Sequence, residues 1–138
     1  MTATTVAREA KRKDGELIAY KMVAVKIPKG ALVSINVAGY ATNSTDASGE
    51  TFAGVAYETV DNSAGLAGDK EIRVETTGTF VFVDGGGKGI QVDVGDEFYI
   101  LDNQTVTHCH TNYSLRAGIC VESINADRVR LRIDRYAS

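Results

Sequence analysis

The chain has 138 residues, a length that suits a single domain, with a formal net charge of −3 and a pI near 5.3. This balance gives no overall attraction to phosphate backbones, which argues against a nucleic acid partner. No stretch is long and apolar enough to span a membrane, and the first residues lack the apolar region of a secretion signal. We therefore expect a protein that is neither membrane-bound nor secreted.

The first 14 residues differ in composition from the rest of the chain. They hold almost no large apolar side chains, and their positive charges outnumber the single acid among the first 13 residues, Glu9. The basic residues are Arg8, Lys11, Arg12 and Lys13. This pattern predicts a flexible basic arm over residues 1–14, followed by a single β domain over residues 15–138.

The remaining composition favours strands, because 15 Val, 9 Ile and 13 Thr stand against 6 Leu and 2 Met. Apolar and polar residues alternate over 127–134 and 71–77, which is typical of a half-buried strand. Further strands are predicted at 17–25, 31–37, 52–60, 97–101 and 115–124. The segments 41–49 and 61–68 are small, polar and glycine-containing, so we expect surface loops there.

One short run is apolar on both faces of its predicted strand. It consists of Phe80, Val81, Phe82 and Val83. Such a run is either enclosed in the core or covered by another chain. The second possibility makes these residues a candidate oligomer interface.

Two parts of the sequence resemble each other. Residues 53–61 (AGVAYETVD) match residues 117–125 (AGICVESIN) at a shift of 64, since 117 − 53 = 64. Upstream, residues 27–30 match 92–95 at a shift of 65, and downstream, residues 72–74 match 129–131 at a shift of 57. The sequence therefore predicts an all-β fold built from a duplicated three-stranded unit, two copies of which close a sheet on itself as a barrel or sandwich.

The candidates for chemistry are few. His108 and His110 would share one face of a strand, as two metal ligands require, with Cys109 on the other face, but no further histidine exists. The glycine-rich stretch 84–90 lacks the Ser/Thr and the helix that a phosphate-binding loop needs. Cys109 and Cys120 are expected to be free, buried thiols. We expect no enzymatic activity, no cofactor and no metal.

Three segments together resemble a known protein family. They are 94–100 (VGDEFYI), 116–122 (RAGICVE) and 129–133 (VRLRI). Their order is similar to that of the phage capsid decoration proteins, also called cement proteins, over residues 15–136. The chain departs from that pattern in its longer basic N-terminus, its triple-glycine loop and its His-Cys-His segment, which leaves the contact surface open.

The resemblance implies a small β-barrel or tulip-like fold that forms a homo-oligomer, a trimer, on the exterior of an icosahedral head. There it would bind the major capsid protein and stabilise the shell by bridging its subunits, with no catalytic site. Assembly would take place in the host cytoplasm. Arg8, Lys11, Arg12 and Lys13 are the candidate capsid contacts. The alternatives are another virion β-module, such as a head-tail joining or tail protein, and a small metal- or ligand-binding barrel.

Overall fold

All regular secondary structure in the described residues is β-strand, as the composition predicts. The computed structural model describes residues 3–4, 6–7, 15–46, 49–85, 94–108, 115–125 and 127–134. The strands are β1 (Leu17–Lys21), β2 (Lys26–Ile27), β3 (Leu32–Ile35), β4 (Ala41–Asn43), β5 (Thr51–Ala56), β6 (Val60–Asp61), β7 (Glu71–Glu75), β8 (Thr77–Asp84), β9 (Glu97–Ile100), β10 (Thr105–Thr107), β11 (Arg116–Asn125) and β12 (Arg128–Asp134). No helix in the described residues is long and apolar enough to cross a membrane.

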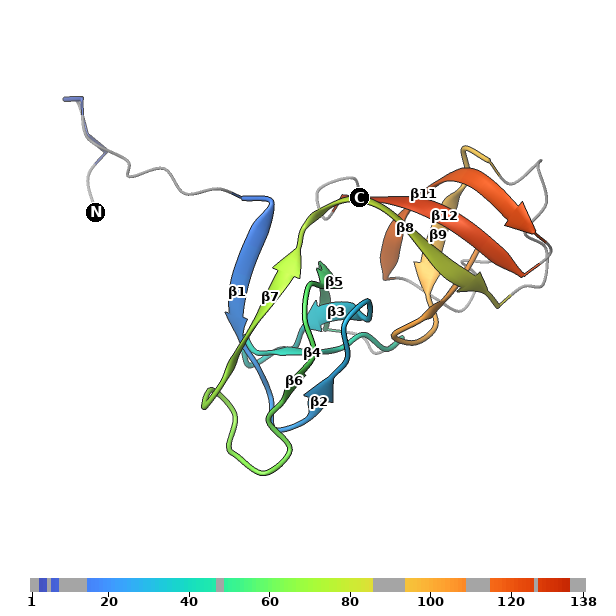
Figure 1. Cartoon of the computed structure of the whole chain (residues 1–138). Coiled ribbons are helices and arrows are strands. Elements are labelled where there is room, and N and C mark those ends of the chain that lie inside the picture. Colours follow the sequence, from blue (N-terminus) through green and yellow to red (C-terminus); the bar gives the residue numbers. More distant parts are fainter. Residues whose placement is uncertain are drawn as a thin grey trace.

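The strands form two successive units (Figure 1). In the N-terminal unit, residues 15–75, five strands pair in the order β1-β7-β5-β3-β4. A single bridge between Met22 and Ala41 returns the end of β1 to β4, so this sheet also curls round on itself. In the C-terminal unit, residues 77–134, the strands β10-β8-β12-β11-β9 form a closed barrel. The predicted β-barrel is thereby confirmed.

The two units pair their strands in the same register. Leu32 pairs with Val55 and Glu97 with Ile119, at shifts of 65 and 64. Each pair of strands then skips one residue, Ala53 in β5 and Ala117 in β11, which forms a β-bulge at the same place. The predicted duplication is therefore confirmed in the pairing of the strands.

Backbone hydrogen bonds repeat with the same offsets. The Gly30 N–H donates to Ala56 O at 2.9 Å, and the Gly95 N–H donates to Cys120 O at 2.7 Å. The repeat also extends beyond the three predicted strands. The Met22–Ala41 bridge of the first unit corresponds to the Asp84–Val106 pair of the second. Each unit thus curls separately through five strands, with β2 and β6 of the N-terminal unit paired apart from its main sheet, whereas the sequence had suggested that two three-stranded units share one sheet.

The segment 41–49 is not entirely a loop. Residues 41–43 form β4, and Ala41 is buried in the core of the N-terminal unit. The prediction of a loop was wrong at these residues because the strand is short and its composition is small and polar. Its strand conformation comes from pairing with β3 through Ile35 and Ser34, which local sequence does not indicate.

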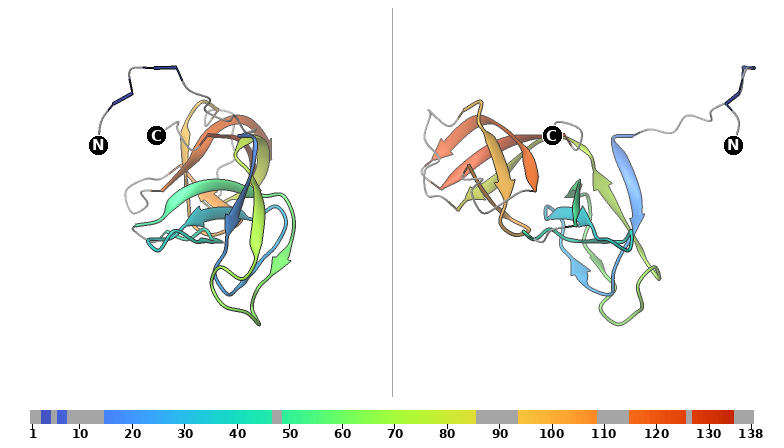
Figure 2. Two further views of the ribbon diagram at one scale, coloured as in Figure 1. Left: turned by 90° about the vertical axis from the view of Figure 1, so that its left-hand side faces the viewer. Right: turned by 180° about the vertical axis from the view of Figure 1, so that it is seen from behind.

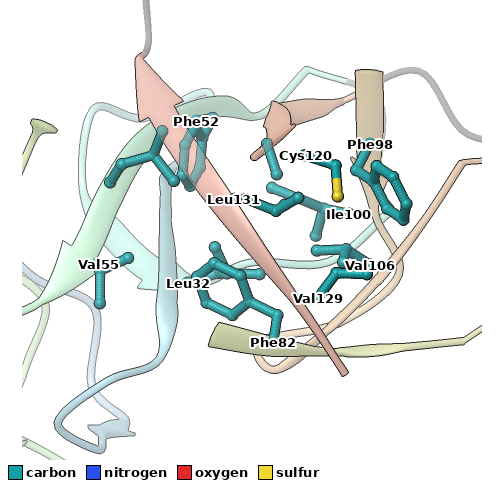
Figure 3. Close-up of a cluster of buried hydrophobic side chains, with 12 residues drawn as sticks. Leu32, Phe52, Val55, Phe82, Phe98, Ile100, Val106, Cys120, Val129 and Leu131 are labelled. Carbon is teal, nitrogen blue, oxygen red and sulfur yellow. The ribbon is translucent and has the colours of Figure 1, made fainter. Parts of the chain in front are cut away.

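The units adjoin through one shared hydrophobic cluster (Figure 3). Leu32, Phe52 and Val55 lie on β3 and β5 of the N-terminal unit, yet they belong to the cluster that fills the C-terminal barrel. Their chain neighbours Val33 and Ala53 face the other way, into the N-terminal core. Each of the three buried side chains is worth about 1.5–3 kcal/mol relative to exposure. This cluster, with the continuous β7–β8 ribbon, holds the units together (Figure 2).

Two equivalent glycines allow the close approach of backbones within each unit. A Cβ on Gly54 would lie 2.1 Å from Glu75 O, and a Cβ on Gly118 would lie 2.1 Å from Arg132 O. Gly54 also has a φ of 151°. No side chain fits at either position without movement of the neighbouring strand.

We predict that Gly54→Ala and Gly118→Ala each lower the free energy of unfolding by about 1–3 kcal/mol or more, because the added methyl collides with backbone. Urea unfolding of the two variants and the wild type measures this. Gly15→Ala is the control, since nothing lies within 4 Å of the position its Cβ would take. An unchanged midpoint for Gly118→Ala would contradict the proposed packing of β11 on β12.

Candidate interaction surface

The predicted site residues fall in two groups. Arg8, Lys11, Arg12 and Lys13 lie outside the described residues. The apolar run lies on β8 and alternates: Phe82 is buried in the barrel core, Phe80 packs partly buried against the same cluster, Val83 is partly exposed and Val81 is 43% exposed. The outward residues Val81 and Val83 are therefore the members of the run that another molecule can reach most easily.

A row of arginines lies beside these valines. Arg128, Arg130 and Arg132 occupy alternate positions of β12, opposite the buried Val129, Leu131 and Ile133. Strand β12 is central, with β8 on one side and β11 on the other. We define the arginine face as these three arginines together with Val81 and Val83 of β8 and Ile119 and Val121 of β11.

The equivalent face of the N-terminal unit carries different charges. At a shift of 57 residues, the positions of Arg128, Arg130 and Arg132 correspond to Glu71, Arg73 and Glu75. The same type of unit forms with glutamates at the two outer positions, so the fold does not require arginines there. Arg128 and Arg132 are therefore not needed for the fold and instead set the charge of this exposed surface.

The central arginine forms the same ion pair in both units. Arg73 contacts Glu58 at 3.0 Å, and Arg130 contacts Glu122 at 3.0 Å. The Arg73 guanidinium also lies 5.0 Å from the centre of the Tyr57 ring. The hydrogen bond from the Arg73 side chain is the largest cause that lowers the pKa of Glu58 from the ordinary value of 4.5, and the hydrogen bond from the Arg73 backbone N–H is the second. The same contact raises the pKa of Arg73.

A second outer surface of the C-terminal unit is polar where its counterpart is apolar. Glu97 and Arg116 occupy the positions of Leu32 and Phe52, and they form an ion pair at 3.0 Å. The Tyr99 hydroxyl donates to Glu97 at 2.8 Å, which is the main reason that the pKa of Tyr99 is raised. The apolar contact between the units is thus not repeated at this end of the chain.

The candidates for metal binding and catalysis are placed only in part. His108 packs its ring against Phe98, with centroids 6.0 Å apart, while Cys109 and His110 lie outside the described residues. Cys120 is buried in the barrel core, as expected. Among the residues that the structure describes, no three His, Cys, Asp or Glu side chains are grouped to hold a metal.

Sequence reasoning identified β12 as a strand but did not single out the arginine face. The signal was present, because the alignment of residues 72–74 with 129–131 also places Glu71 and Glu75 opposite Arg128 and Arg132. A comparison of charges between the two repeats would have found the difference.

We predict that Arg73→Gln raises the pKa of Glu58 toward 4.5, because the largest cause of its lowering is removed. A carboxyl group with a lowered folded pKa stabilises the fold above its unfolded pKa and loses this contribution as pH falls through the folded pKa. The stability difference between wild type and Arg73→Gln should therefore be present at neutral pH and shrink below about pH 4. NMR titration of Glu58 and urea unfolding at several pH values measure the two effects.

Lys26→Gln is the control for this titration, since Lys26 acts on Asp61 instead. It should leave the pKa of Glu58 unchanged. A Glu58 pKa of 4.5 or more in the wild type would contradict the ion pair.

Comparison with known proteins gives no relative from which a role can be transferred. No protein-family model, curated protein or solved structure matches the chain. The two units of the chain therefore serve as references for each other.

Proposed function

We propose that the protein is a phage capsid decoration protein, a non-catalytic structural protein that binds the outside of an assembled head. In this role it bridges major capsid protein subunits and stabilises the shell. The arginine face carries the proposal, together with the resemblance of the three sequence segments. Arginine is enriched at protein interfaces, where lysine is depleted, and the buried centre of an interface is more apolar than its rim.

The chemistry of the arginine face favours a protein partner over a nucleic acid. Its three arginines belong to a chain of net charge −3, and their neighbours on β8 and β11 include the aliphatic Val81, Val83 and Ile119 beside the polar Thr79 and Glu122. Binding to nucleic acid draws on many clustered cations and, for single strands, on aromatic side chains that stack on bases. A protein surface with carboxylates and aliphatic groups matches this face better.

The stabilisation follows from mass action. A protein that binds the assembled shell better than its separate subunits lowers the free energy of the assembly. Two firmly joined units present separate faces, so one molecule can contact two coat subunits. Self-association as a trimer would multiply these contacts. The basic arm would add attraction that salt weakens.

We predict that the double variant Arg128→Glu/Arg132→Glu binds empty heads at least tenfold more weakly than the wild type, a loss of about 1.4 kcal/mol or more. Each substitution installs the residue that the N-terminal unit carries at the equivalent position, so the fold should persist. Cosedimentation with heads, followed by heating of the heads, measures binding and protection.

The control is Lys21→Glu/Lys26→Glu, which changes the net charge by the same amount on exposed positions of the N-terminal unit. It should bind like the wild type. Failure of the wild type to bind heads would overturn the proposed function, and binding confined to one vertex by electron microscopy would indicate a head-tail joining protein. Equal binding of both double variants would exclude the arginine face.

We predict separately that removal of residues 1–13 weakens binding to heads at low salt, because Arg8, Lys11, Arg12 and Lys13 would supply electrostatic attraction. The effect should diminish as salt is added. If the truncated protein binds and protects heads as well as the full chain at low salt, the arm has no role in docking.

A further inference from the structure

The loop between β6 and β7 is an insertion that the fold does not require. Asp61 and Lys70 correspond to Asn125 and Asp127 of the C-terminal unit, where one residue makes the connection. The shift of 64 before the loop falls to 57 after it, so the N-terminal unit has seven more residues here, 64 − 57 = 7. The shorter connection shows that this topology closes without the insertion.

The inserted loop is nevertheless well braced. Asn62 is 1% exposed, and its Nδ2 donates to Val23 O at 3.2 Å and to Leu66 O at 3.0 Å. The Leu66 N–H donates to Asp69 Oδ2 at 2.9 Å, and the Gly68 N–H donates to Met22 O at 2.9 Å. The backbone around Leu66 is thus held from both sides.

This braced backbone presents a leucine to solvent. The Leu66 side chain is 74% exposed. An exposed leucine on a prearranged loop contributes nothing to the core, but it loses little conformational entropy when another surface covers it. A prearranged apolar side chain of this kind can fill a pocket on a partner at a low entropic cost.

A pocket of suitable chemistry lies on the same molecule, between the two units. Its volume is about 230 Å³, enough room for a leucine side chain. It is lined by Lys29, Gly30, Val55, Ala56, Tyr57, Glu75 and Phe80. Val55, Phe80 and the Tyr57 ring supply its apolar surface, while Lys29 and Glu75 supply one charge of each sign.

Leu66 does not reach the pocket of its own molecule. The loop between β6 and β7 extends from the end of the N-terminal unit that lies away from β8, in each view of the chain (Figures 1 and 2). The pocket instead includes Phe80 of β8 and Glu75 at the end of β7. An occupant of the pocket must come from another molecule.

We propose that Leu66 of one copy inserts into the pocket between the two units of a second copy. The loop carries Asp61, Asp69 and Lys70 and the pocket lining carries Lys29 and Glu75, so each side of the contact offers a partner for the charges of the other. Leu66 and the pocket lie on different surfaces of the molecule, so the contact is head-to-tail. This contact would be the structural basis of the self-association included in the proposed function, and it rests on the proposed function in that respect. The purified protein is nevertheless sufficient to test it.

Sedimentation velocity of the full chain over a range of concentrations is the first test. We expect the wild type to associate and Leu66→Ser to associate at least tenfold more weakly. Val37→Ser is the matched control, since Val37 is 87% exposed on a different turn and should not affect association. A wild type that stays monomeric throughout, or a Leu66→Ser variant that associates equally, would overturn the proposal.

Crosslinking identifies the contact itself. In a C109S background, chains with L66C mixed with chains with Y57C should form a disulfide-linked dimer, because Tyr57 lines the pocket and is partly exposed. Neither variant should crosslink alone. Efficient crosslinking of L66C chains to each other would overturn the head-to-tail contact. Failure to bind heads leaves these outcomes unchanged, so the two proposals fail separately.

Discussion

The close approach of two backbones at a residue without a side chain is the constraint on which both units depend. At Gly54 and at Gly118, the strand comes so near its neighbour that a carbonyl oxygen occupies the space of a Cβ. The β-bulge at the preceding alanine increases the local twist. Together these features let a sheet of short strands curl tightly, which buries one face and leaves few exposed edges.

Much of the strand pattern could be predicted because each main strand has one buried and one exposed face. The alternation over 127–134 gave the correct burial of Val129, Leu131 and Ile133. The repeat was visible because the bulge and its glycine leave the short signature Ala-Gly in both units. Both features depend on residues that are close together in the chain, so they can be recognised from one sequence without a structure.

The separate closure of each unit could not be predicted in the same way. Alternation shows which face of a strand is buried, but it does not show which strand lies beside it. Strands β4 and β10 have three residues each, and their pairing with β3 and β9 lets each unit curl alone. The inserted loop was predicted to be a surface loop, which holds for Leu66 but not for Asn62, which is buried, or for Asp61, which belongs to β6. The order of the loop comes from Asn62 and its distant contact with Val23, which the local sequence does not show.

The ion pair between Glu97 and Arg116 makes the outer surface of the C-terminal unit a poor match for another apolar sheet. The N-terminal unit adds its neighbour through Leu32 and Phe52, and a third unit added in the same manner would cover the equivalent positions. Covering the pair would remove water from two charges at a cost that their attraction does not reliably offset. The C-terminal unit therefore presents a charged surface where the N-terminal unit presents an apolar one, and this surface disfavours a second contact of the kind that joins the two units.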